Sequence, residues 1–132
     1  MTQILPWIAA ALLVAIAVTV IVGRGAGGTG SWRSFAVFSA AFFGFTVYAI
    51  AREGLGFWTE HTRNLWGNQI WFDLLLAAGI GWFLVLPRLR AAGLAPLPWL
   101  LVILASGSIG FLALIARLLW VEARRPEAGR PA

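Results

Sequence analysis

The segment 57–73 contains the side chains of this chain that are best suited to acid–base chemistry. Glu60 and His61 are adjacent, and His61 is the only histidine in the sequence. An imidazole titrates near neutral pH and often serves as a general acid or base. Neighbours in a helix do not face each other, so Glu60 is a poor partner for His61. Asp73, Glu53 or Glu122 is a more plausible partner. The catalytic candidates are therefore Asp73, His61 and Glu60.

Motifs for metal-dependent or nucleophilic chemistry are missing from the sequence. The chain has no cysteine, which excludes disulfides, iron–sulfur clusters and Cys-based zinc sites. It also has no P-loop, HExxH motif, nucleophile elbow or paired-aspartate motif. We predict no metal site, and no motif indicates a cofactor. His61 alone is a poor metal site; it is interpreted first as a hydrogen-bonded interfacial residue, then as an acid–base group, and last as a ligand of a chlorophyll-type pigment.

The composition indicates a membrane protein. Of 132 residues, 61% are hydrophobic and 11% are charged, and the mean hydropathy is +0.86. A soluble domain of this size leaves too much of its surface exposed to hide so many apolar side chains. The net charge of +5 comes from arginines that flank apolar runs. This placement favours anionic lipid headgroups as partners and argues against nucleic acid.

Four apolar runs approach the roughly 20 residues that a helix needs to cross a bilayer. We predict an all-α fold: an integral membrane antiparallel bundle of four transmembrane helices in a single domain, residues 1–125, followed by a polar tail, 126–132. The first run has no basic residues before it and is long for a signal peptide, so it is expected to remain as a helix. The predicted helices are about 4–23, 35–51, 70–90 and 97–121.

A short amphipathic helix is predicted between the second and third spans. Tryptophan is typical of the depth where lipid meets water, because its ring is apolar and its N–H is polar. Trp58, Trp66 and Trp71 are therefore expected to form an interfacial belt. The helical spacing of three and four residues is carried by Leu55, Trp58, Thr62, Leu65 and Trp66.

Small residues recur four apart in every predicted span. Apolar burial does not drive helix association in lipid, so close packing at small residues and interhelical hydrogen bonds must do so. We interpret Ser39, Ser106 and Ser108 as residues that form hydrogen bonds within a helix or between helices. The small pairs are Ala11 and Ala15, Ala40 and Gly44, Ala77 and Gly81, and Ser106 and Gly110.

Two charged residues fall inside predicted spans and are expected to form a structural ion pair. Asp73 lies near the start of the third span and Arg117 near the end of the fourth. Antiparallel helices would bring them to one depth, although separate snorkelling to water is the alternative. Any chemistry is expected at this end. The same end would receive a polar cluster of Arg52, Glu53, Glu60, His61, Arg63, Asn64, Asn68, Gln69 and Glu122.

Four crossings would place both termini on the same side of the membrane. Five arginines on that side against four on the other favour a cytoplasmic location of the termini under the positive-inside rule. The expected location is the bacterial inner (cytoplasmic) membrane, with a multi-pass topology.

Residues 68–94 and 97–124 resemble a family of small bacterial integral membrane proteins known as domain of unknown function 2834. The resemblance extends over about residues 40–125, and the first predicted helix is extra to the pattern. It implies a small helical inner-membrane protein and supplies no activity. The residues that carry it are Phe72, Asp73, Leu74, Leu75, Trp82, Arg90, Gly93, Trp99, Gly110, Leu118 and Leu119.

The lack of a catalytic constellation, together with many small and aromatic residues suited to contacts, predicts a non-enzymatic accessory or assembly subunit of a membrane complex. Its expected partners are the lipid bilayer and either other membrane subunits or a second copy of the chain. One alternative is a membrane enzyme acting on a lipid or isoprenoid substrate through Asp73, His61 and Glu60. Another is a pigment- or quinone-associated subunit of an energy-converting complex.

Overall fold

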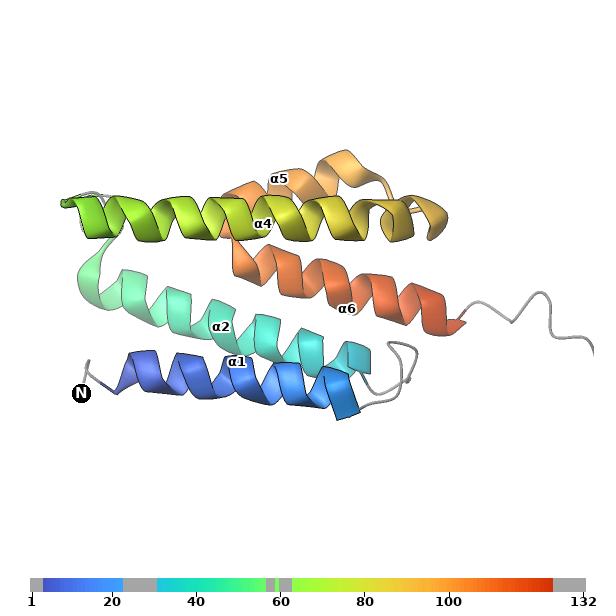
Figure 1. Cartoon of the computed structure of the whole chain (residues 1–132), viewed down its shortest axis with the longest axis horizontal. Coiled ribbons are helices and arrows are strands. Elements are labelled where there is room, and N and C mark those ends of the chain that lie inside the picture. Colours follow the sequence, from blue (N-terminus) through green and yellow to red (C-terminus); the bar gives the residue numbers. More distant parts are fainter. Residues whose placement is uncertain (1–3, 23–30, 57–58, 60–62, 125–132) are drawn as a thin grey trace, which may run out of the picture.

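The computed structural model describes residues 4–22, 31–56, 59 and 63–124 of the chain. These residues form five α-helices and no strand, which confirms the all-α prediction (Figure 1). The helices are α1 (Leu5–Val22), α2 (Ser31–Glu53), α4 (Leu65–Ala91), α5 (Pro96–Ser106) and α6 (Ser108–Arg124).

The first three predicted spans each correspond to one helix. The third begins earlier than predicted, because Asn64 caps it: its side-chain Oδ1 accepts a hydrogen bond from the backbone N–H of Gly67 at 2.7 Å. Asparagine is a preferred residue at this position, since it satisfies a backbone donor that has no partner within the helix. The stretch from Leu65 to Gln69, predicted as a flank, therefore belongs to α4.

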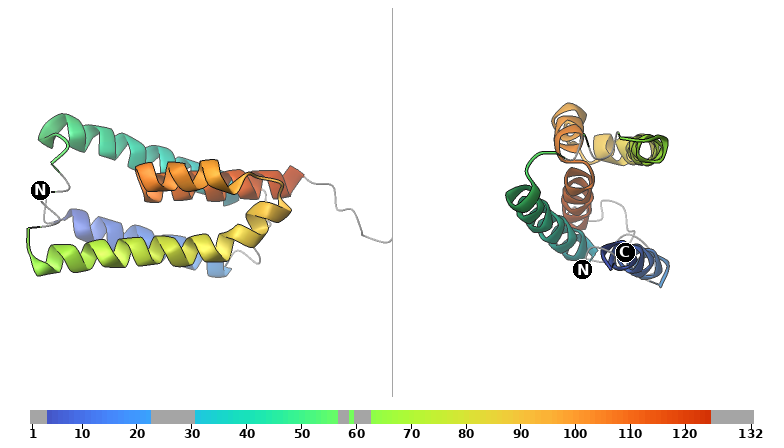
Figure 2. Two further views of the ribbon diagram at one scale, coloured as in Figure 1. Left: turned by 90° about the horizontal axis from the view of Figure 1, so that it is seen from above. Right: turned by 90° about the vertical axis from the view of Figure 1, so that its left-hand side faces the viewer.

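The predicted fourth helix, 97–121, is wrong, because the chain reverses at Gly107. This residue has φ 58° and ψ −125°, a conformation that glycine adopts far more easily than any residue with a Cβ atom. The result is an antiparallel hairpin of α5 and α6 (Figures 1 and 2). With 11 and 17 residues, the two helices are about 16 and 25 Å long, and both are shorter than the roughly 30 Å hydrocarbon core.

The chain turns between α4 and α5, in the short connection that separates the predicted helices 70–90 and 97–121. Gly93 has φ 69°, and the N–H of Leu94 donates to the carbonyl oxygen of Leu89 at 3.1 Å. This combination ends the helix in a Schellman motif. Pro96 then starts α5, where its missing N–H has no structural consequence. Pro87 lies within α4, and the last turns of this helix bend toward α5 and α6 (Figure 2).

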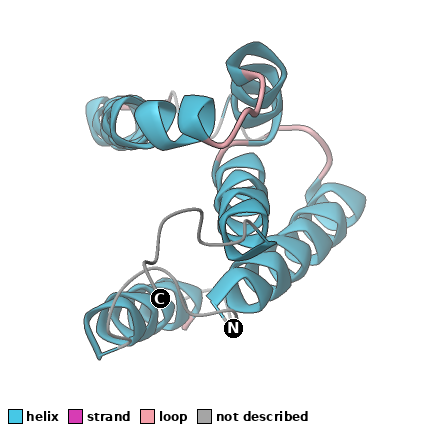
Figure 3. Ribbon diagram, turned by 90° about the vertical axis from the view of Figure 1, so that its right-hand side faces the viewer, coloured by secondary structure: helices cyan, strands magenta, loops and turns pink. Residues whose placement is uncertain are grey.

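The core is built around α6. Seen along the long axis, α6 lies between α2 on one side and α5 with α4 on the other (Figures 2 and 3). Leu89, Leu114 and Leu118 are completely buried there. Val85, Ala92 and Ile103 complete the buried cluster. Its α4 members all come from the last turns of that helix, so the core occupies the end of the molecule where α4 and α6 finish.

The small residues contribute unequally to packing. A Cβ on Gly81 would lie 2.8 Å from the ring of Phe111, and a Cβ on Gly110 would lie 2.9 Å from the carbonyl oxygen of Val102. Close approach is confirmed at these two glycines, whereas Gly44 has nothing within 4 Å of such a Cβ. α1 has no close backbone contact with the other described helices.

By length and composition, two helices of the described chain can cross a membrane: Trp32–Glu53 in α2 and Leu65–Ala91 in α4. A bundle of four spans is not confirmed. α1 begins at the end of the molecule opposite to the one where α6 finishes (Figure 1). The reasoning that placed both termini on one side assumed a continuous fourth span, and the reversal at Gly107 removes that basis.

Candidate functional site

The predicted polar end is formed by the last turn of α2 and the first turns of α4. Its side chains mostly bond to their own helix. The Asn68 Nδ2 donates to the carbonyl oxygen of Asn64 at 3.0 Å, and the Gln69 Nε2 donates to the Asp73 Oδ2 at 3.0 Å. Together with the cap at Asn64, these bonds explain the amide-rich sequence as the start of a helix. Arg52 and Glu53 end α2, and both side chains are exposed.

Several predicted site residues lie outside the described residues: Trp58, Glu60 and His61. The interfacial helix and the acid–base role of His61 therefore stay predictions. Nearby, Arg63 is exposed, and the Thr59 hydroxyl donates to the carbonyl oxygen of Gly56 at 2.8 Å. Two predicted interfacial tryptophans are in the first turns of α4, where Trp66 is exposed and Trp71 is half-buried.

The predicted Asp73–Arg117 ion pair is wrong for the described structure. Asp73 accepts a hydrogen bond from Gln69, while the Arg117 guanidinium lies over the ring of Trp120. Their separation follows from the reversal at Gly107, because α6 runs in the same direction as α4 (Figure 1). Arg117 is therefore carried toward the far end of α4 and away from its start.

Glu122 was expected to join the polar cluster, and this prediction is also wrong. Its carboxylate is bound by Arg88 through two bonds, from Nε to Oε1 at 3.2 Å and from Nη2 to Oε2 at 2.7 Å. A bidentate pair of this kind fixes the orientation of both groups. It connects the end of α4 to the end of α6, between residues 34 positions apart. Arg88 lies a few residues before the last residue of α4. Along this helix it is 15 residues, or about 22 Å, from Asp73.

A second group of arginines surrounds Trp120. The Cζ atoms of Arg117 and Arg124 lie 4.3 and 4.0 Å from the centre of the Trp120 ring. Arg33 lies 5.5 Å from the ring of Trp32 in the same manner. Such cation–π contacts form when a guanidinium sits over an aromatic face. The spacing of three and four residues around Trp120 is the helical one, so this group was detectable in the sequence.

Charge is distributed unequally between the two ends of the described chain. The arginine-rich end, as we name it, consists of the start of α2 and the ends of α4 and α6. This end has five described arginines and one described acid, Glu122, so its formal charge is +4. At the opposite end two arginines, Arg52 and Arg63, balance Glu53 and Asp73. The five are Arg33, Arg88, Arg90, Arg117 and Arg124.

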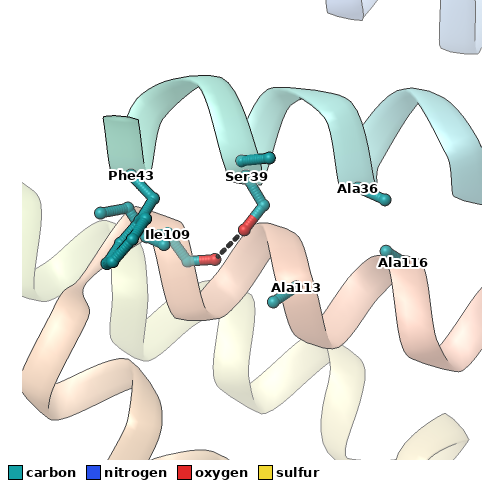
Figure 4. A pocket seen from close by; sticks show the side chains of 7 residues that line it. Ala36, Ser39, Phe43, Ile109, Ala113 and Ala116 are labelled. Carbon is teal, nitrogen blue, oxygen red and sulfur yellow. Dashed lines mark hydrogen bonds between the residues drawn. The ribbon is translucent and has the colours of Figure 1, made fainter. Parts of the chain in front are cut away.

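Two adjoining hollows run along the contact between α2 and α6, and together we call them the α2–α6 groove. The larger, of about 360 Å³, is lined by small and apolar side chains (Figure 4). The other, of about 300 Å³, extends the groove toward the arginine-rich end. The first is lined by Ala36, Ser39, Ala40, Phe43, Ile109, Ala113 and Ala116, and the second by Trp32, Ala36, Ala116, Arg117 and Trp120.

Ser39 is the one hydroxyl side chain lining the groove, and its hydrogen bond confirms the predicted role. It is 8% exposed, and its Oγ donates to the carbonyl oxygen of Ile109 at 2.9 Å across the helix pair (Figure 4). Ser106, in contrast, bonds within its own helix: its Oγ donates to the carbonyl oxygen of Val102 at 2.7 Å. The groove lining includes no carboxylate or imidazole. It is suited to holding an apolar chain beside a cationic group, and it has no acid–base pair for catalysis.

No protein-family model, no curated protein and no solved structure matches this chain.

Proposed function

We propose that this chain is a non-enzymatic membrane protein that serves as an accessory or assembly subunit of a larger complex. The observation that carries the proposal is the exposed apolar surface of α4, which extends almost all the way around the middle of the helix. Six large apolar side chains between residues 74 and 84 are about half or more exposed. They are Leu74, Leu75, Leu76, Ile80, Phe83 and Leu84. Exposed apolar patches of this extent are typical of surfaces that lipid or another protein covers.

The alternative of a membrane enzyme has less support. It required a cavity that reaches Asp73, and the two hollows of the α2–α6 groove are lined by α2 and α6 alone. The Asp73 carboxylate is held by a neighbouring side chain of its own helix. The pigment- or quinone-associated alternative depends on His61, which lies outside the described residues.

The proposed membrane arrangement has α2 and α4 crossing the bilayer and the α5–α6 hairpin re-entering from one side. Segments of 10–14 apolar residues are typical of re-entrant elements, and α5 has 11. Because the positive-inside rule counts arginines near helix ends, the arginine-rich end is assigned to the cytoplasmic side of a bacterial inner membrane. Five of the seven described arginines lie at that end.

Single-cysteine labelling tests this arrangement directly, because the chain has no cysteine of its own. Three variants report on three positions: Thr59→Cys beyond α2, Ala95→Cys before α5, and Ala123→Cys near the end of α6. In intact cells, a membrane-impermeant maleimide is expected to label only Thr59→Cys. In inverted vesicles it should label only the other two. Labelling of Ala123→Cys together with Thr59→Cys would restore a continuous fourth span and overturn the hairpin.

Crosslinking from the exposed apolar surface of α4 tests the role as a subunit. A Leu76→Cys variant carrying a photoactivatable crosslinker, irradiated in native membranes, is expected to give one adduct of defined mass. Leu101→Cys, on the exposed side of α5, is the matched control and should give adducts with lipid but none with a protein. Mass spectrometry then separates another subunit from a second copy, whose adduct would have twice the mass of the 14.3 kDa chain. If Leu76→Cys captures only lipid, the subunit proposal fails.

A further inference from the structure

We infer that the α2–α6 groove is a binding site for an anionic phospholipid. One acyl chain would lie along the groove, and the phosphate would bind beside Trp120, at Arg117 and Arg124. This inference rests on the membrane location proposed above and not on the role as a subunit.

The groove has the shape and chemistry of an acyl-chain site. Its two hollows share Ala36 and Ala116, so they form one track along the helix pair. Alanine side chains keep the track open where larger residues would fill it (Figure 4). Its one hydroxyl, that of Ser39, is already bonded to the Ile109 carbonyl oxygen. A ligand part that needs no hydrogen bond is therefore suited to this track, and a hydrocarbon chain is such a part.

The cationic groups at one end of the track are not neutralised within the described chain. Arg117 lines the second hollow and shares the Trp120 ring with Arg124. The acid closest to them in the sequence of α6, Glu122, is held by Arg88 through both of its oxygens. In the described residues, neither Arg117 nor Arg124 has a carboxylate partner. Guanidinium groups bind phosphate oxygens through short charge-assisted hydrogen bonds, so a phosphate is the complementary partner.

The tryptophans place this end of the groove at headgroup depth. Trp32 and Trp120 both line the second hollow, beside Arg117. Tryptophan is enriched where the hydrocarbon meets the headgroups, which is the depth of a phospholipid phosphate. The apolar track and the arginines therefore lie in the order in which a phospholipid presents its chain and its phosphate.

The charge of this end favours a lipid with a net negative charge. A formal charge of +4 repels the choline of a zwitterionic lipid and attracts a headgroup that carries only the phosphate charge. Free inorganic phosphate offers the same oxygens without a chain to fill the groove. The proposed ligand is thus an anionic glycerophospholipid, for which phosphatidylglycerol is the probe.

Native mass spectrometry of the full chain in a nonionic detergent measures this binding. Dioleoyl phosphatidylglycerol and dioleoyl phosphatidylcholine are titrated against the wild type, Arg117→Gln and Arg90→Gln. The Arg90 variant is the matched control: it removes the same charge from the same end, but Arg90 is on α4 and does not line the groove. Phosphatidylglycerol is expected to bind Arg117→Gln about tenfold or more weakly than the wild type and Arg90→Gln within about twofold of it.

A second variant tests the apolar track without changing any charge. Ala36→Leu adds a branched side chain where the two hollows meet and should also weaken phosphatidylglycerol binding about tenfold. Circular dichroism shows whether Arg117→Gln folds. If it does not fold, Ala36→Leu still tests the proposal. Inorganic phosphate in millimolar excess should leave the lipid bound; displacement by phosphate would reduce the site to an anion site and overturn the proposal.

Three further results would overturn the inference: equal losses in Arg117→Gln and Arg90→Gln, phosphatidylcholine bound as tightly as phosphatidylglycerol, or full binding by Ala36→Leu. Failure of the membrane proposal is distinguishable, because the chain would then remain monodisperse in buffer before any lipid or detergent is added. Failure of the subunit role would appear only in crosslinking and would leave the lipid titration unchanged.

Discussion

Where α4 and α6 finish, Leu89, Leu114 and Leu118 are completely buried, whereas at the start of α4 Leu65 and Trp66 are 87% and 78% exposed. Both regions are rich in large apolar residues, so hydrophobicity alone does not decide which of them packs. Along α6 the described residues have what the start of α4 lacks: glycines in tight contact and a serine bonded across two helices near the beginning of α6, and a bidentate ion pair near its end. In lipid, such features hold helices together, because apolar contact with lipid is as favourable as apolar contact with protein.

The largest expected effect comes from truncating the packed end. Leu114→Ala removes a fully buried side chain of the central helix and should destabilise the fold by about 2–5 kcal/mol, because the cavity it leaves cannot close completely. Leu76→Ala makes the same change in the exposed part of α4. Because the Leu76 side chain is 63% exposed, this change should alter stability little. Reversible unfolding in detergent with increasing dodecyl sulfate measures both. Equal losses would mean that the two regions are packed alike in solution.

Replacing a glycine by alanine is expected to have an intermediate effect on stability. It tests how closely the helix backbones approach each other. Gly110→Ala should destabilise the fold by about 1–3 kcal/mol, because the new Cβ would lie 2.9 Å from the Val102 carbonyl oxygen. Gly44→Ala, on α2, has open space around its Cβ and should be neutral or slightly stabilising. The same unfolding measurement applies. A harmless Gly110→Ala would show that α5 and α6 are less closely packed than described.

The smallest expected effect is the coupling between the two ion-pair partners. Their side chains are 45% and 33% exposed, so solvent weakens the attraction. A double-mutant cycle with Arg88→Gln and Glu122→Gln should give a coupling of about 0.2–1 kcal/mol. The cycle with Asp73→Asn and Arg117→Gln should give none. Coupling in the second cycle and not in the first would favour a continuous fourth helix over the hairpin.

Much of the fold was predictable from the sequence, because its main signals are local. Apolar runs of about 20 residues located α1, α2 and α4, and the gap between the third and fourth runs located the turn into α5. The break at Gly107 was not predictable in the same way. It lies within a run of small residues, ASGSIG, that is equally consistent with tight helix packing. The sequence alone does not distinguish a glycine that permits a reversal of the chain from a glycine that permits close contact between helices.

The error at Gly107 accounts for the errors in the candidate site. Matching Asp73 with Arg117 by depth required an unbroken helix from Leu97 onward. Once the chain reverses, Arg117 and Glu122 are carried to the end of α4, where Arg88 binds Glu122 and Arg117 lies over Trp120. The group around Trp120, in contrast, depends only on helical spacing within α6. Local pairs of this kind could be predicted, whereas pairs between helices depend on each turn of the chain.

The isolation of α1 has a consequence for the architecture as a whole. Every side chain that the described structure buries lies at Ser39 or beyond, and α1 has no close backbone contact with the other described helices. Substitutions in the first helix are therefore expected to disturb the packing of the other described helices less than substitutions at Ser39 or beyond.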